Sequence, residues 1–295
     1  MNWTWIEWLD LALRWFHVMA GISWIGSSLY IMWLDRVFAD PDRAARGENG
    51  EPWLIDLTDS LLAGKLAPGP GRFAGTLAWF ARESTLTLAS GLVLFAVLAW
   101  LPGGGILGYA DGRPIGALPG VAIVAGTFAL SWLSYDNLWR SPGRRTATVA
   151  GPASLLLFVA AAWGLTQTFS GRAAFILAGA ALGFVMWANL WLRIRPALRE
   201  LRDSRIAGRP PDVDLRSKAR MRAAHNSYLV FPTVALMLSN HVPHVYSHEL
   251  NWIAMSLLAA ALVGVRHRIV SGRRGAWALY SAVAAFGVAV FLVRG

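Results

Sequence analysis

The segment Leu11–Leu34, LALRWFHVMAGISWIGSSLYIMWL, is long and apolar enough to cross a lipid bilayer as one helix. On a helix with 100° per residue, its polar and small residues share one side. That side carries Asp10, Arg14, His17, Gly21, Trp24, Ser28 and Asp35, and the opposite side carries Leu11, Val18, Ile22 and Leu29. Hydrocarbon offers an imidazole no hydrogen-bond partner, so burial against lipid would cost several kcal/mol. We therefore predict that His17 faces other helices of a bundle.

The composition excludes an ordinary soluble domain. Of the 295 residues, 56% are hydrophobic and 15% are charged, which is typical of an all-α, polytopic membrane protein. The first ten residues contain Glu7 and Asp10 but no basic residue, so we expect no cleaved signal peptide. The absence of cysteine excludes disulfides, thiolate metal sites and a covalently attached c-type haem within this sequence.

Apolar runs predict a single domain, residues 1–295, with eight membrane-spanning helices. These spans are 8–34, 77–101, 116–136, 148–169, 172–195, 222–240, 250–267 and 275–293. The sixth span is the weakest, because Asn226 and Ser227 interrupt it and Pro232 should kink it and free a carbonyl. Two Gly/Pro-rich pieces, KLAPGPGRF at 65–73 and LPGGGILGYADGRPIGALPG at 101–120, are predicted loops.

Basic residues gather in the odd-numbered connections between these spans. The connection after the fifth span alone contributes ten, from Arg193 to Arg222, whereas almost none lie in the even-numbered connections. This asymmetry places the odd loops in the cytoplasm and both termini outside. It also accounts for most of the net charge of +10, so we expect no nucleic-acid partner.

Four ordered strings carry a family resemblance over nearly the whole chain. They are LRWFHVMAGISWIGSSLYIMWLD, WLSYDNLWRSP, GLTQTFSGRAAFI and HNSYLVFPTVALMLSNHVPHVYSHELNW. They resemble the membrane domain of the cytochrome-c-linked bacterial urate oxidases. The resemblance implies an eight-helix domain in the bacterial cytoplasmic membrane, oxidation of urate through haem, and a c-type cytochrome that follows the membrane domain outside the cell. The segment HVMAGISWIG is also similar, more weakly, to haem-binding membrane oxidoreductases such as the membrane protoporphyrinogen oxidases.

The sequence departs from the pattern of that family at three histidine positions. The resemblance implies histidines before the second helix, at its start and near the outer end of the fifth, where this chain has Leu61–Lys65 without histidine, Ala78 and Leu177. A haem that needed those ligands could not form here. The chain also ends at Gly295, directly after the eighth predicted span, without a cytochrome.

His17 is the candidate axial ligand of a b-type haem, because neutral imidazole binds haem iron well. Gly21, one turn further on, is expected to leave room for the flat macrocycle. A second ligand would have to be new, and His241 in the outer loop is one candidate. The loop also holds His244 and His248, which leaves a metal site or merely solvated histidines as alternatives. A purely structural, hydrogen-bonded His17 is the alternative for the first helix.

Glu83 is the candidate proton acceptor, because an acid two turns into an apolar span is costly unless it is paired or hydrated. Thr87 and Ser90 continue its face of the helix. The alternative is a salt bridge to Arg82 or to loop arginines.

The start of the sixth span carries the candidate substrate contacts. Urate is a planar purine anion, and its recognition needs in-plane donors and acceptors, a positive charge and a flat wall. The residues that could supply these are Arg222 with neighbouring Arg220, and His225, Asn226 and Tyr228, with His225 also a catalytic candidate. The alternative is an interfacial helix start with snorkelling arginines.

Other polar and small residues favour structural roles. We expect Asp136, Asn137 and Asn189 to form hydrogen bonds between helices and the Gly179/Gly183 pair to allow close helix packing. His267 is expected on the cytoplasmic surface.

Three functions remain open at this point. The first is a membrane oxidoreductase that oxidises urate or a similar purine through b-type haem and passes electrons to a separate cytochrome c. The second is a transporter of purine anions. The third is a non-catalytic relative that has lost the cofactor.

Overall fold

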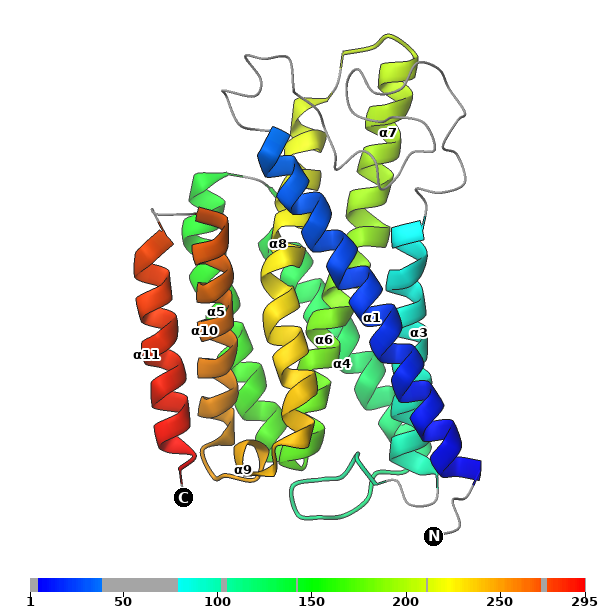
Figure 1. Cartoon of the computed structure of the whole chain (residues 1–295), viewed down its shortest axis with the longest axis vertical. Coiled ribbons are helices and arrows are strands. Elements are labelled where there is room, and N and C mark those ends of the chain that lie inside the picture. The colour runs from blue at the N-terminus through cyan, green and yellow to red at the C-terminus, as the bar shows by residue number, and fades with distance from the viewer. Residues whose placement is uncertain are drawn as a thin grey trace. The chain divides into compact units, whose positions relative to one another are not determined.

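The regular structure of this computed structural model is helical, as the composition predicts (Figure 1). The structure describes residues 5–38, 79–101, 105–141, 143–210, 212–271 and 275–294. The longer helices are α1 Trp5–Phe38, α3 Trp79–Trp100, α4 Ala117–Leu138, α5 Arg144–Thr168, α6 Gly171–Ala188, α7 Arg195–Ile206, α8 Val213–Leu238, α10 Asn251–Ser271 and α11 Ala276–Leu292. Short elements are the π-helix η3 Asn189–Ile194, the 3-10 helix η4 Ser239–His241 and α9 Pro243–Tyr246.

Each predicted span overlaps a helix of the structure, although some of the bounds differ. Within the described residues, five helical segments are long and apolar enough to cross a membrane, which indicates a multi-pass membrane protein. They are Ala81–Trp100, Ala117–Leu138, Ala147–Thr168, Gly171–Leu201 and Asn251–Ser271. The apolar helix α11 is shorter, with 17 residues. Eight crossings and the orientation of the termini stay predictions, and the predicted loop at 65–73 lies outside the described residues, as do Leu61–Lys65 and Ala78.

The fifth predicted span does not end at residue 195. Helix α6 passes through the π-helix η3 directly into α7, so that helical backbone runs from Gly171 to Ile206. At about 1.5 Å per residue this is roughly 54 Å, well beyond a hydrocarbon core of about 30 Å. The backbone N–H of Arg195 bonds to the carbonyl of Leu190, five residues back, just before Pro196. A wider turn accommodates the missing N–H and the bulk of a proline without breaking the helix.

Helix α8 also extends beyond its predicted start at residue 222. It begins at Val213 and continues through Pro232 to Leu238, so the proline does not interrupt it. The first half of α8 packs on η3 and α7 through a small apolar core that includes Leu198, Leu201 and Ala219. This core explains why the polar residues before 222 are helical, because the apolar face of α7 needs a partner.

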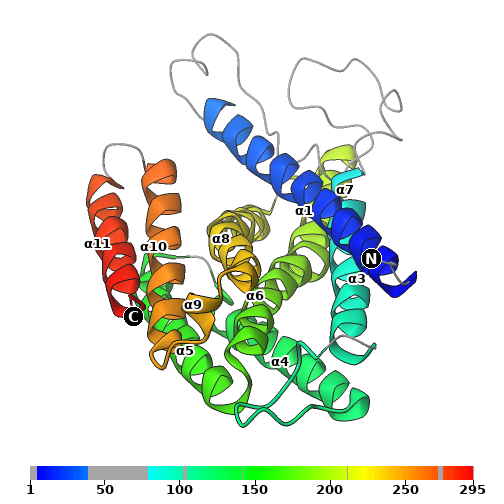
Figure 2. The ribbon, with the colours of Figure 1, turned by 60° about the horizontal axis from the view of Figure 1, so that its bottom comes forward.

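The chain forms two compact units, which we describe separately. The first comprises residues 1–94 and 187–227, and the second comprises residues 95–186 and 228–295. Within the second unit, α10 lies beside α11 and also contacts α5 (Figure 2). There α6 packs on the second half of α8, where a Cβ on Gly179 would lie 3.1 Å from Cβ of Leu236. The predicted close packing at the Gly179/Gly183 pair is therefore confirmed.

The loop before α4 contributes to the core of the second unit. Its residues Ile106, Leu107 and Ile115 are buried together with Phe169 and Leu177. A β-bridge between Tyr109 and Phe169 fixes the loop to the end of α5. Leu177, where the resemblance implies a histidine, therefore occupies a packed apolar core.

We predict that Gly171→Ala lowers the thermal midpoint of the detergent-solubilised protein. A Cβ on Gly171 would lie 1.8 Å from the backbone oxygen of Tyr246, and overpacking of this kind costs about 1–3 kcal/mol or more. Gly164→Ala, within α5, is the matched control because a Cβ there meets nothing within 4 Å. Alanine favours a helix interior by about 0.5–1 kcal/mol, so this variant should be unchanged or more stable. Equal midpoints for both variants would contradict the packing at Gly171.

Candidate functional site

The polar stripe of α1 faces the protein, as predicted. Trp24 is 7% exposed, whereas Val18 and Ile22 on the opposite side are 53% and 60% exposed. The partner of the stripe is the first half of α3 in the same unit, and the two helices run antiparallel along this seam. His17 meets Ser90, Gly21 faces Thr87 and Ser23 meets Glu83.

The imidazole of His17 is fixed by two neighbouring residues of α3. Its Nδ1 lies 3.1 Å from Oγ of Ser90, and a Cβ on Gly91 would lie 2.8 Å from its Cε1. A side chain at position 91 would thus displace the ring. The prediction that His17 faces another helix is confirmed. Sequence reasoning identified Ser90 as part of the face of Glu83 but missed its contact with His17, and it missed Gly91 altogether.

Gly21 lies opposite Thr87 of α3. A Cβ on Gly21 would be 3.8 Å from Cγ2 of Thr87, an ordinary van der Waals contact. The expectation that Gly21 leaves room for a macrocycle stays a prediction.

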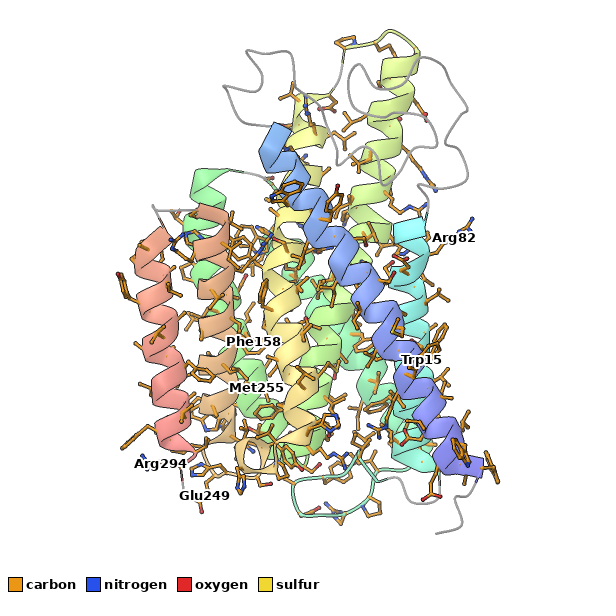
Figure 3. All side chains as sticks on the ribbon, in the orientation of Figure 1. Trp15, Arg82, Phe158, Glu249, Met255 and Arg294 are labelled. Carbon is orange, nitrogen blue, oxygen red and sulfur yellow. The ribbon has the colours of Figure 1, made fainter. Side chains whose placement is uncertain are left out.

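Glu83 is buried, with 3% of the residue exposed. Its Oε1 accepts a hydrogen bond of 2.8 Å from Oγ of Ser23, and its Oε2 has no partner among the described residues. The alternative of a salt bridge to Arg82 is wrong, because Arg82 is exposed and directed outward from α3 (Figure 3). A buried polar atom without a partner costs about 1–3 kcal/mol, and a charged one more.

A second polar group lies where η3 meets the first half of α8. Asn189 is fully buried, donates from Nδ2 to Oδ1 of Asn226 over 2.9 Å, and accepts from Nη1 of Arg222 over 3.2 Å. Arg222 is itself 4% exposed, and His225 follows it on the same helix by one turn. The predicted bonding between helices by Asn189 is confirmed. The residue also opens a π-helix, an element that is frequent at functional sites.

Two tryptophans connect this group to α3. Nε1 of Trp191 donates to Oγ of Ser84 over 3.2 Å, directly beside Glu83, and Nε1 of Trp187 donates to Oγ1 of Thr85 over 3.3 Å. The indole rings lie 6.5 Å apart, and the guanidinium of Arg195 stacks over Trp191. The sequence analysis did not identify either tryptophan. Two Trp residues about one turn apart, on either side of Asn189 in an apolar helix, could have indicated a polar site.

The first compact unit thus contains five of the seven predicted site residues. They are His17, Glu83, Arg222, His225 and Asn226. Hydrogen bonds connect α1, α3, η3 and α8 within this unit: Ser23 to Glu83, Trp191 to Ser84, and Asn189 to Arg222 and Asn226. The arrangement provides two cations, two amides, two flat indoles and one buried carboxyl; one of the cations, Arg195, covers a face of Trp191.

The other two predicted site residues belong to the second unit. The hydroxyl of Tyr228 bonds to Nδ1 of His267 over 3.0 Å, and Nε2 of His267 lies 3.2 Å from Oγ of Ser271. His267 is therefore partly buried and bonded through both nitrogens, and its expected surface position is wrong. His241 is exposed at the end of α8. Across the described residues, no three His, Asp or Glu side chains converge as a metal site, and the outer loop is included in this finding.

One expected contact between helices is also wrong. Asn137 is exposed and donates to the backbone oxygen of Leu133 in its own helix.

Comparison with models of protein families shows which family the chain belongs to. The model of the family described as Urate oxidase N-terminal matches residues 3–294. The chain belongs to this family. Among the curated proteins and among the solved structures, no match was found.

The described residues of this urate oxidase N-terminal domain would offer a haem one histidine nitrogen here, Nε2 of His17, because Nδ1 lies 3.1 Å from Oγ of Ser90. A Cβ on Gly91 would contact the same imidazole. A metal-bound histidine ordinarily has its other nitrogen fixed in this way. Leu177 lies in a packed core and supplies no ligand.

We predict that Asn189→Leu lowers the thermal midpoint in detergent by several degrees. The substitution removes an acceptor of the buried guanidinium of Arg222 and a donor to Asn226, at a cost of about 1–3 kcal/mol. The matched control is Asn137→Leu, at an exposed position whose amide bonds to the backbone oxygen of Leu133 and to the guanidinium of Arg140 just beyond the helix. An equally small effect of both substitutions would show that the buried network contributes no stability.

Proposed function

We propose that this urate oxidase N-terminal domain oxidises urate or a similar purine anion in the bacterial cytoplasmic membrane. Electrons leave through a b-type haem to a separate cytochrome c. The observation that carries the proposal is the buried polar group around Arg222 and Asn189, connected through Trp191 to the helix that bears Glu83, in a chain of this family.

The Arg222 group has the chemistry that a purine anion requires. Urate is flat and mostly monoanionic at neutral pH, so its binding needs a cation, in-plane donors and acceptors, and a flat wall. Arg222 supplies the positive charge, and the amides of Asn189 and Asn226 each offer a donor and an acceptor. The indoles of Trp187 and Trp191 offer flat faces, and His225 adds a ring nitrogen. Low dielectric around the buried guanidinium strengthens its attraction for an anion.

Glu83 is the proton acceptor in this proposal. Two-electron oxidation of the purine with addition of water releases protons, which a base must accept. Ser23 holds one oxygen of the carboxyl, and the second oxygen has no partner in the described part of the chain. A carboxylate that is fixed at one oxygen and unoccupied at the other is suited to accept a proton.

His17 would hold the haem through Nε2, with the imidazole plane fixed by Ser90 and Gly91. When bound, the haem would supply a one-electron acceptor between the substrate and the cytochrome. His241 remains the predicted candidate for a second ligand.

An absorption spectrum and a reduction assay together test the proposal. The full chain, expressed with ample haem and purified in detergent, should show a Soret band and should reduce added cytochrome c when urate is supplied without oxygen. A missing Soret band together with no reduction would overturn the proposal. Counterflow of labelled urate in proteoliposomes would then favour the transporter, and its absence would favour a non-catalytic relative.

We predict that two substitutions separate binding from chemistry. Arg222→Gln should weaken urate binding about 10- to 100-fold, because a hydrogen bond to a charged group contributes about 1.5–3 kcal/mol. Glu83→Gln should leave binding nearly unchanged and slow oxidation about 100-fold or more, as expected for a lost general base. The dissociation constant comes from calorimetry and the rate from cytochrome c reduction.

Two further variants control this pair. Arg222→Lys keeps the charge and should recover part of the affinity. Arg209→Gln removes an exposed arginine that pairs with Glu200 over 3.6 Å and should change neither quantity. Wild-type turnover in the Glu83 variant would exclude Glu83 as the base.

A further inference from the structure

The hydroxyl of Ser90 has one proton, and its neighbours determine where that proton goes. Ser90 is 6% exposed, and its Oγ lies 2.6 Å from the carbonyl oxygen of Leu86 and 3.1 Å from that of Thr87. Carbonyl oxygens accept but never donate, so the hydroxyl proton points to its own helix. The side of Oγ that faces His17 is therefore a lone pair.

Nδ1 of His17, 3.1 Å from this oxygen, must then carry a proton to form the observed contact. A neutral imidazole has a single ring proton, so Nε2 keeps its lone pair. We infer that Ser90 is a positioning residue that fixes His17 as the Nδ1–H tautomer. Its consequence for haem, a basic Nε2 presented to iron, rests on the function proposed above.

Gly91 makes this contact possible. A Cβ at position 91 would lie 2.8 Å from Cε1 of His17 and 3.2 Å from Nδ1, so a larger residue would push the imidazole away from Ser90. Gly91 thus leaves space for the imidazole ring, and Ser90 beside it provides the acceptor for the ring proton.

The competing explanation is that Ser90 only bonds to its own backbone, as serines in helices often do. Ser28 of α1 provides the comparison, because its Oγ donates to the carbonyl of Trp24 over 2.7 Å, also in its own helix. If the two serines are equivalent, removal of either hydroxyl should have the same effect on His17.

The experiment is nitrogen NMR of the full chain in detergent, without haem, with ¹⁵N-labelled histidine. His17→Gln assigns the signals of His17. We expect the Nδ1–H tautomer in the wild type and in Ser28→Ala, and loss of this preference in Ser90→Ala. Because Ser90→Ala also changes packing, Ser90→Thr and Ser90→Val form a second pair of nearly equal shape. The threonine should keep the tautomer and the valine should lose it.

Haem titration of the same variants gives the second readout. Loss of the fixing hydrogen bond should lower haem affinity about 10- to 100-fold in Ser90→Val relative to Ser90→Thr. An Nε2–H tautomer in the wild type, or an Nδ1–H tautomer that survives in Ser90→Val, would overturn the inference about Ser90. An Nδ1–H tautomer that depends on Ser90 supports it, even where the wild type binds no haem. A wild type that binds no haem would overturn the haem ligation of the proposed function, and the inference about Ser90 would stand.

Discussion

The antiparallel seam between α1 and α3 depends on one constraint, that a polar side chain in an apolar helix needs a hydrogen-bond partner. His17 and Glu83 lie in apolar helices, and each contacts a serine on the opposite helix. A Cβ on Gly91 would press on the imidazole of His17, so this glycine lets the ring lie against α3. Polar residues therefore determine which faces of the two helices meet, because an apolar face can pack against lipid as favourably as against another helix.

The same constraint explains why the candidate chemistry gathers in the first compact unit. There Arg222 donates a hydrogen bond to Asn189, and the indole N–H of Trp191 donates to Ser84. The second unit instead has cores built from side chains such as Phe175, Leu236 and Met255. The polar groups that the proposed function uses are therefore mostly those of the first unit.

Periodicity and length predicted the features that depend on one helix at a time. The helices, the inward side of α1 and the small face at Gly179 were all readable, because each follows from spacing along a single helix. Features that depend on contact with a second helix could not be predicted in this way. The contact of Gly21 with Thr87 was not predicted, and His267 was misread because Tyr228 reaches it from a distant part of the sequence. The π-turn before Pro196 needed knowledge that α7 continues and finds a core on α8.

The carboxyl of Glu83 is the strongest structural reason to expect chemistry in this domain. Stability alone would favour an apolar residue at this position, since replacing a buried polar group by one of similar shape is often neutral or stabilising. A structural carboxyl would be expected to use both oxygens, whereas this one uses Oε1 with Ser23 and leaves Oε2 without a partner in the described residues. Local rules of polar satisfaction are broken chiefly where function requires it. The proposal of Glu83 as proton acceptor rests on this unpartnered oxygen, one residue from Ser84, which accepts the hydrogen bond of Trp191.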